Sequence, residues 1–303
     1  MKFIVLGSGG TLPVLSRNLP SFALRREGEL LLFDCGEGTQ LQLMRARLGF
    51  GPLKRICISH LHGDHVTGIP GLLMTLGQSC RQKELTIYGP PGIGRYLRAT
   101  MENLALRLDY EVAVEEVEPG VVYEGSQYRI EAAPADHGSF TLAYAFVEGQ
   151  RPGRFDVNKA RELGVPEGPL YRELQIGKDV RLSDGRTVRS HEVVGRPRPG
   201  RKVVYAIDTR PCSAVVELAK DADLLIHDSM FAEELRAEAN ERGHSTALQA
   251  AQVAAGAGVD RLILAHISPR YEDVTELLAE AQSLFPRAAV ARDLMALELP
   301  VHK

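Results

Sequence analysis

The stretch Ser59-His60-Leu61-His62-Gly63-Asp64-His65 places three imidazoles and one carboxylate within a few consecutive residues. Residues 53–58 before it predict a short buried strand, and residues 68–74 after it predict the start of a helix. The cluster therefore lies in a strand-to-helix loop, where side chains can converge beyond the edge of a sheet. His60 and His62 alternate, so they point to the same side of an extended segment, and Gly63 lets the chain turn before the next two polar residues.

This cluster suits two adjacent metal ions, one for each pair of polar residues. Neutral imidazole combined with a carboxylate oxygen favours zinc, with manganese as the second candidate, over calcium or magnesium. The alternative is a polar surface loop that is merely rich in histidine. The density of ligands and the strand–loop–helix context argue against that alternative.

The same order of elements, a strand followed by His or Asp, recurs along the chain. Strands are predicted over residues 128–133, 203–207, 224–226 and 261–265. The polar residues that follow them are His137, Asp208, His227 and His266. Five strand ends, counting that of His60, are difficult to explain by core packing, although His227 is interpreted as a buried structural histidine.

Two metals need about seven or eight bonds from protein ligands, so the available groups divide naturally. Asp208 would bridge the two ions through its two oxygens, and Asp34, after the predicted strand 30–33, would orient a metal-bound histidine or a loop amide. The two sets are His60, His62 and His137 for one metal, and Asp64, His65 and His266 for the other. Such a site hydrolyses bonds at phosphorus or at a carbonyl, and Asp64 would also steer the nucleophile.

His244 lies outside this ligand set and is the candidate general acid. It would protonate a leaving alkoxide or stabilise a phosphate oxygen, and Asp228 would orient it. The alternative is a histidine that stabilises the first turn of the Ala-rich helix predicted after residue 246. In that helix Ser245 is the expected N-cap.

The composition is that of a globular protein. The chain has 303 residues, of which 44% are hydrophobic and 25% charged, enough for one large α/β domain or two small ones. No apolar run approaches the length of a membrane span, so no membrane partner is expected. The four cysteines are scattered without a C-x-x-C pair, which favours a reducing, cytoplasmic compartment.

Positive charge is concentrated in residues 151–202. This segment holds 13 Lys or Arg against 7 Asp or Glu, whereas the remainder holds 23 against 32. The excess suits a phosphate-rich partner, but charge alone leaves open a solvated insertion without any partner. Because the segment is rich in Gly, Pro and Arg and shows weak apolar periodicity, we expect a protruding arm with few core-facing residues.

The motif H-x-H-x-D-H at residues 60–65, followed in order by His137, Asp208 and His266, resembles the metallo-β-lactamase superfamily. The resemblance implies a four-layer αββα sandwich with a dinuclear zinc site at one edge. It also implies that residues 1–303 form a single α/β domain and that residues 151–202 are an inserted, basic, flexible arm.

More specific motifs are similar to the short form of ribonuclease Z, a family of tRNA 3′-processing endonucleases. Residues 13–18, Pro-Val-Leu-Ser-Arg-Asn, resemble the family loop P-x-K-x-R-N, and residues 164–169, Gly-Val-Pro-Glu-Gly-Pro, resemble the hairpin of the arm that binds tRNA. Residues 208–211, 243–246 and 266–271 agree as well. The implied RNA-binding residues are Arg17, Asn18, Gly164, Pro166, Gly168 and Pro169.

This resemblance implies a homodimer with two Zn²⁺ per chain that cuts precursor tRNA and leaves a 3′-hydroxyl. Two departures stand out: the loop lysine of the family is Leu15, and the glutamate of its H-E-A-T segment is Asp228. Two other functions stay open. One is a phosphodiesterase for cyclic nucleotides or other small molecules, for which a basic arm has no use, and the other is a non-catalytic, zinc-stabilised RNA-binding module.

Overall fold

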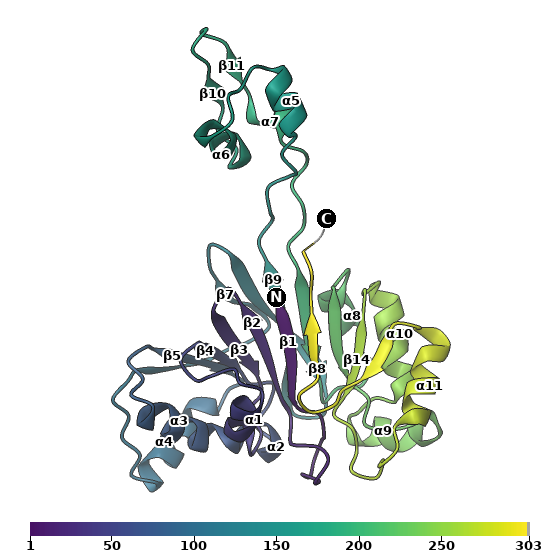
Figure 1. The fold of residues 1–303 in the computed structure, drawn as a ribbon. Helices are drawn as coiled ribbons and strands as arrows, with labels where there is room; N and C mark the ends of the chain where they lie inside the picture. Colours follow the sequence, from purple (N-terminus) through teal and green to yellow (C-terminus); the bar gives the residue numbers. More distant parts are fainter. Residues whose placement is uncertain (302–303) are drawn as a thin grey trace. The chain divides into compact units, whose positions relative to one another are not determined.

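A computed structural model of the protein describes residues 1–301 (Figure 1). The chain divides into two compact units. The larger unit comprises residues 1–125, 129–147 and 202–300, and the second is formed mainly by residues 148–201. The predicted insertion, residues 151–202, therefore falls almost entirely within the second unit.

The larger unit contains two seven-stranded sheets. In spatial order the first sheet consists of β16 (Ala296–Glu298), β1 (Lys2–Gly7), β2 (Ser21–Arg26), β3 (Glu29–Phe33), β4 (Leu53–Cys57), β5 (Leu85–Gly89) and β6 (Val112–Glu116). The second consists of β15 (Ala288–Val290), β14 (Leu262–Ala265), β13 (Leu224–Asp228), β12 (Lys202–Ala206), β9 (Phe140–Glu148), β8 (Tyr128–Asp136) and β7 (Gly120–Glu124). Each sheet has a parallel part, from β3 to β6 and from β12 to β15, so several carboxyl ends meet at one edge.

Helices cover the outer face of each sheet (Figure 1). Leu43, Leu72 and Leu97, from three different helices, pack on the first sheet, and α8, α10 and α11 pack on the second. The helices of this unit are α1 (Thr39–Arg45), α2 (Gly63–Val66), α3 (Gly68–Gln78), α4 (Ile93–Asn103), α8 (Ser213–Ala219), α9 (Arg236–Arg242), α10 (Ala247–Ala257) and α11 (Thr275–Leu284), with a 3₁₀ turn η1 (Glu233–Leu235). The order of layers is helix, sheet, sheet, helix, which confirms the predicted αββα sandwich. None of the helices within residues 1–301 combines the length and apolarity needed to cross a bilayer.

Aromatic rings fill the space between the two sheets. Tyr205 of β12 packs against Phe22 of β2 and Phe33 of β3, with ring centroids 5.3 and 5.2 Å apart. Tyr144 of β9 lies 6.5 Å from Phe33. All four side chains are essentially fully buried, and burying each contributes about 1.5–3 kcal/mol. This layer fixes the register of one sheet against the other, and with it the positions of their strand ends.

Most long elements were predictable from hydrophobic pattern. The strand and helix expected on either side of the histidine cluster are β4 and α3. The sequence analysis did not predict β2, β7 or α8. Each has at most seven residues, so its periodicity is brief, and only packing within the sandwich identifies it.

The predicted N-cap of α10 is wrong. Thr246, and not Ser245, caps this helix, because its hydroxyl accepts a hydrogen bond from the Gln249 N–H while the Gln249 side chain accepts one from the Thr246 N–H. This reciprocal pair needs Gln or Glu three residues after the cap, which Thr246 has and Ser245 lacks. The Ser245 hydroxyl instead donates to the Thr209 carbonyl at 2.6 Å.

The second unit has its own small core, so the expectation of few core-facing residues is wrong. Short elements surround this core: α5 (Val157–Glu162), α6 (Pro169–Gln175), β10 (Val180–Arg181), β11 (Thr187–Val188) and α7 (Ser190–Val193). The buried residues are Ala160, Val165, Leu174, Val180, Leu182, Val188 and Val193. Five of them lie in these elements of seven residues or fewer, and Val165 and Leu182 lie in the connecting segments, so no visible period arises.

Two passages of the chain lie antiparallel within the second unit and enclose these elements. Arg151 and Arg198 exchange backbone hydrogen bonds of 2.9 Å, and the Gly195 N–H donates to the Arg154 carbonyl, also at 2.9 Å. Arg201 binds the Glu148 carboxylate through Nε and Nη2, each at 2.7 Å, and both side chains are buried. The residues that lead into the small core and those that leave it are therefore neighbours.

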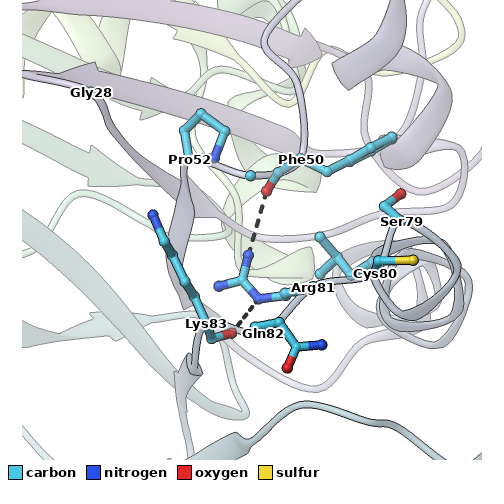
Figure 2. Close-up of a pocket in the computed structure, with 10 residues that line it drawn as sticks. Gly28, Phe50, Pro52, Ser79, Cys80, Arg81, Gln82 and Lys83 are labelled. Atoms are coloured by element: carbon cyan, nitrogen blue, oxygen red, sulfur yellow. Dashed lines mark hydrogen bonds between the residues drawn. The ribbon is translucent and has the colours of Figure 1, made fainter.

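Arg81 secures the loops at one end of the first sheet (Figure 2). Its guanidinium is 7% exposed and donates to four backbone carbonyls, those of Lys83, Leu53, Glu84 and, at 3.4 Å, Phe50. The first three distances are 2.6, 2.6 and 2.7 Å. The side chain thus joins the loop before β4 to the segment that leads into β5.

We expect Arg81→Ala to lower the free energy of unfolding by about 2–4 kcal/mol, because buried carbonyls lose a charged donor. Urea denaturation measures the change. Lys83→Ala is the control, because it removes an exposed side chain and retains the Lys83 carbonyl, which is the group that Arg81 binds. Equal unfolding midpoints for the two variants would show that Arg81 does not hold these loops together.

Candidate metal centre

The predicted ligands lie at the carboxyl ends of strands from both sheets of the larger unit. His60 and His62 follow β4 in the first sheet, and the next helical turn, α2, carries Asp64 and His65. In the second sheet His137 and His266 directly follow β8 and β14, and Asp208 lies two residues after the end of β12. The structure therefore brings all seven predicted ligands to one edge of the sandwich.

These side chains belong to three groups of close ligand atoms, and Asp208 is a member of two of them. One group comprises His60, His62, His137 and Asp208, another comprises Asp64, His65 and His266, and the third comprises Asp208, Asp228, His244 and His266; within each group the ligand atoms lie within 4.8 Å of one another. Asp208 Oδ2 lies 3.0 Å from His60 Nε2 and 3.1 Å from His65 Nε2, and its Oδ1 lies 2.9 Å from His266 Nδ1. Asp208 is thus placed between the first two groups, as a bridging carboxylate requires.

Three residues around this edge have a left-handed backbone that L side chains rarely adopt. The φ angles are 56° at Asp34, 56° at Asp208 and 60° at His266. Asp34 and His266 directly follow a strand and Asp208 lies two residues after one, where a normal φ would continue the strand direction. A left-handed residue costs about 1–2 kcal/mol, so the packed sandwich holds these side chains against a local preference.

The donor atoms fit a divalent metal. Among the residues that the structure describes, no hydrogen bond reaches Nε2 of His60 or His65, either ring nitrogen of His266, or Oδ1 of Asp208. Buried polar atoms without partners are costly, so a cluster of them at one point indicates a missing partner. Since imidazole nitrogens and carboxylate oxygens suit zinc and manganese, the residues present fit such an ion.

The electrostatics of the cluster favour a cation. Burial and the neighbouring His65 lower the pKa of His60 to about 4. Burial acts in the same direction on His266, but the Asp208 carboxylate outweighs it and raises the pKa of His266 to about 10. For Asp64, burial alone would raise the pKa, yet the His266 and His65 rings, whose Nε2 atoms lie 3.6 and 3.5 Å from Oδ2, bring it far below its ordinary value. The carboxylates therefore stay ionised, and their charge attracts a cation.

Backbone and carboxylate partners orient the histidines. His65 Nδ1–H donates to Asp34 Oδ2 at 2.7 Å, and the Ser59 hydroxyl donates to the same oxygen at 2.7 Å. His137 Nδ1–H donates to the Gly243 carbonyl at 2.8 Å. In each case the hydrogen bond fixes the tautomer that leaves Nε2 free to bind a metal.

His244 and Asp228 lie together beside this cluster. Asp228 Oδ2 accepts a hydrogen bond of 2.7 Å from His244 Nδ1–H, so the pairing survives the shorter side chain. The same carboxylate accepts the N–H groups of Thr209 and Met230 at 3.1 and 3.0 Å, which hold it in place. His227 is fully buried, and its Nδ1 lies 2.8 Å from the Asp228 carbonyl, outside the ligand groups.

The loop after β1 supports the centre more directly than the sequence suggested. The Thr11 N–H donates to Asp64 Oδ2 at 2.9 Å, and a Cβ at Gly10 would lie 2.6 Å from the His266 ring. The close contact of this loop, Gly7-Ser8-Gly9-Gly10-Thr11, with a ligand ring is visible only in three dimensions.

Arg17 and Asn18, both predicted to bind RNA, make hydrogen bonds within the protein. The Arg17 guanidinium is 9% exposed and donates to the Tyr271 carbonyl at 2.6 Å. The Asn18 amide donates to Asp293 Oδ2 at 2.7 Å, and Asp293, which sequence reasoning missed, also accepts from Ser8. These contacts fix the loop against the C-terminal part of the unit, and RNA binding by the two residues stays a prediction.

A cavity opens beside the ligands, and two arginines that the sequence analysis did not single out line it. They are Arg242 and Arg270, which with His244 and Phe231 complete its wall. Glu238 binds Arg270 at 2.9 Å and Arg242 at 3.0 Å. The two guanidiniums thus share one carboxylate at the mouth of the cavity, which suits an anionic substrate.

The other predicted RNA-binding residues lie in the second unit, in the turn between α5 and α6. Gly164 and Gly168 have φ angles of 79° and 137°, which only glycine adopts readily. Pro169 is the first residue of α6, where its fixed φ suits a helix start. The motif thus encodes the shape of this turn, and its contact with RNA stays a prediction.

Comparison with known proteins identifies the family. A family model described as "Beta-lactamase superfamily domain" matches residues 180–267, and one described as "Anti-Pycsar protein Apyc1" matches residues 1–151. Ribonuclease Z of Methanosarcina acetivorans is 48% identical over 301 residues, which are 99% of this chain and 98% of that protein. The chain belongs to the ribonuclease Z family.

A second ribonuclease Z, from Haloferax volcanii, is also 48% identical, over 99% of this chain and 95% of that protein. The crystal structure of human tRNase Z, short form, matches with a TM-score of 0.72 at 28% identity, and covers 99% of this chain and 100% of that one. The resemblance inferred from the motifs is therefore confirmed. The protein is a hydrolytic nuclease of the metallo-β-lactamase superfamily, and its His and Asp clusters suit a divalent metal.

We expect Gly10→Ala to weaken metal binding about tenfold or more, because the added Cβ displaces the His266 ring. Competition with a chromogenic chelator measures the affinity. Gly256→Ala is the control: nothing lies within 4 Å of a Cβ at this position in α10, so metal affinity stays unchanged. Wild-type affinity in the Gly10 variant would show that His266 takes no part in binding.

Proposed function

We propose that the protein is an endoribonuclease that removes the 3′ trailer from precursor tRNA, using two Zn²⁺ per chain, with Mn²⁺ as the alternative metal. The observation that carries the proposal is the position of Asp208 between two groups of ligand atoms. Relatives at 48% identity are named ribonuclease Z, and the matching human structure is a tRNase Z. The proposed ligands are His60, His62, Asp64, His65, His137, Asp208 and His266.

Bound at this edge, the metals would act as Lewis acids and lower the pKa of a water molecule, which attacks phosphorus. Asp64, held by the Thr11 N–H, would orient the attacking oxygen. Arg242 and Arg270 would bind the non-bridging phosphate oxygens from the mouth of the cavity. These interactions bring the phosphodiester into line with the attacking oxygen.

His244 would complete the reaction as general acid. The new P–O bond forms as the bond between phosphorus and the 3′-oxygen breaks, and the leaving 3′-oxygen takes a proton from His244. The products are a tRNA with a 3′-hydroxyl and a trailer with a 5′-phosphate. Asp228 stabilises the protonated imidazole through its 2.7 Å hydrogen bond, and the backbone donors on Asp228 keep the pair aligned.

The second unit is the proposed tRNA-binding region. Its segment, residues 151–202, carries 13 Lys or Arg against 7 Asp or Glu, and a rigid core supports this charge. The phosphate backbone of folded RNA supplies the complementary charge. A small cyclic nucleotide has no use for such a region, and for this reason tRNA is favoured over a small-molecule substrate.

We also propose that the enzyme is a homodimer and that it acts in the cytoplasm. Each chain would form a single metallo-β-lactamase domain that carries the second unit as an insertion. The four cysteines are unpaired thiols, as a reducing compartment maintains them. The dimer follows from the resemblance to the family, and the cytoplasm is where precursor tRNA would be met.

The substrate test compares the intact protein with a variant in which two glycines replace residues 155–194. The splice is geometrically simple because Arg154 and Gly195 already share a backbone hydrogen bond of 2.9 Å. We expect kcat/KM for a 3′-extended precursor tRNA to fall about a hundredfold, because phosphate contacts are lost. Hydrolysis of bis(p-nitrophenyl) phosphate should continue at the wild-type rate, which also shows that the larger unit is folded.

Equal loss on both substrates would mean that the second unit stabilises the larger one and has no role in tRNA binding. Hydrolysis of the small diester without any cleavage of tRNA, by either protein, would favour the small-molecule phosphodiesterase.

Asp64→Asn tests the chemistry. We expect the variant to lose about a thousandfold in kcat on both substrates, and to retain less metal than wild type by elemental analysis, because a ligand and an orienting carboxylate are lost. Asp136→Asn is the control, since this exposed carboxylate next to His137 only pairs with Arg210 at the surface. Full turnover by a metal-loaded Asp64 variant would exclude the assigned role.

A further inference from the structure

A buried hydrogen-bond cluster around Asp34 contains one member that comes from the opposite sheet. Asp34 follows β3 and is fully buried. Its Oδ2 accepts hydrogen bonds from the Ser59 hydroxyl, from His65 Nδ1–H and from the Tyr205 hydroxyl, at 2.7, 2.7 and 2.6 Å. Its Oδ1 accepts the Ser59 N–H at 2.7 Å. Ser59 and His65 lie in the loop and the helix α2 that follow β4, the neighbour of β3 in the first sheet, whereas Tyr205 belongs to β12 of the second sheet.

The position of the Tyr205 hydroxyl is set by packing between the sheets. The ring is fully buried and lies against Phe22 and Phe33 at 5.3 and 5.2 Å. Burial, together with the Asp34 carboxylate, raises the pKa of Tyr205 well above its ordinary value, so the phenol keeps its proton and donates a hydrogen bond. The hydroxyl therefore donates to Asp34, and the packed ring cannot turn to bring it to another acceptor.

The same strand also delivers Asp208, three residues further along the chain. Asp208 Oδ2 lies 3.1 Å from His65 Nε2, while Asp34 binds His65 at the other ring nitrogen. One end of β12 thus contacts both sides of His65: directly through Asp208, and through the Tyr205–Asp34 hydrogen bond. The imidazole is held between two groups whose separation depends on a single strand.

We propose that Tyr205 is a positioning residue of the metal centre, which acts through Asp34 to fix the orientation of His65 and to couple it to Asp208 across the sandwich. The inference rests on the proposed metal-dependent function. Without the phenol, Asp34 keeps its hydrogen bonds to Ser59 and His65 but loses the one that joins it to β12, so the carboxylate is held less closely. The His65 ring then loses the fixed direction in which its Nε2 points toward the ligand group of Asp64 and His266.

Tyr144 provides a matched control within the same layer. It is also a fully buried tyrosine whose ring packs on Phe33, and its hydroxyl also makes one short hydrogen bond, of 2.8 Å. The acceptor is the backbone carbonyl of Ile58 and not a carboxylate. Tyr205→Phe loses a hydrogen bond to a charged carboxylate and Tyr144→Phe one to a neutral carbonyl, so stability is measured separately and zinc affinity reports the effect through Asp34.

The experiment measures the zinc affinity of full-length wild-type protein, Tyr205→Phe and Tyr144→Phe by competition with a chromogenic chelator, and the thermal unfolding of each metal-free protein. We expect both variants to fold and to lose thermal stability, with the larger loss in Tyr205→Phe, because its buried hydrogen bond is made to a charged carboxylate. Zinc affinity should fall about 10- to 100-fold in Tyr205→Phe and stay at the wild-type value in Tyr144→Phe.

A double-mutant cycle with Asp34→Asn tests the route. Because Tyr205 acts through Asp34, adding Tyr205→Phe to Asp34→Asn should cause no further loss of zinc affinity. Wild-type affinity in Tyr205→Phe, equal losses in both tyrosine variants, or additive losses in the cycle would each overturn the inference. A wild-type protein that binds no divalent metal would overturn the metal centre itself, which is a distinct result.

Discussion

The carboxylate of Asp208 is the contact on which the site depends. It lies within about hydrogen-bond distance of His60 and His65, from the first sheet, and of His266, from the second. An ionised carboxylate buried among histidines is stable only if positive charge compensates it. The centre therefore exists only while two separate sheets hold their strand ends within a few ångströms of each other.

The sandwich supplies that precision through its aromatic inner layer. Phe22 and Phe33 on one side and Tyr144 and Tyr205 on the other pack into a continuous, fully buried layer. Because packed interiors do not deform gradually, the layer fixes the two sheets in one register. The apolar interior and the polar edge are thus parts of a single arrangement, and Tyr205 belongs to both.

The same packing supports unfavourable local geometry. Left-handed backbone at Asp34, Asp208 and His266 costs about 1–2 kcal/mol per residue, and several buried donor atoms have no partner among the described residues. The large core offsets these costs. Concentration of strain and unpaired polar atoms at one edge is typical of a functional site, and here both observations select the same residues as the ligand motif.

Local pattern in the sequence determined much of this protein. The H-x-H-x-D-H motif and the polar residues at strand ends sufficed to predict the candidate ligands, because each depends on neighbours in the chain, and the sandwich followed from the family resemblance that these motifs carry. The N-cap of α10 was also determined locally, because Gln249 lies three residues after Thr246, although Ser245 was the predicted cap. Only the tertiary structure decided the core of the second unit and the close approach of Gly10 to His266. It also decided the ion pairs of two arginines with Glu238 and the hydrogen bond from Tyr205 to Asp34. Each of these joins residues whose proximity depends on the packing of separate elements, which no local period or spacing in the sequence records.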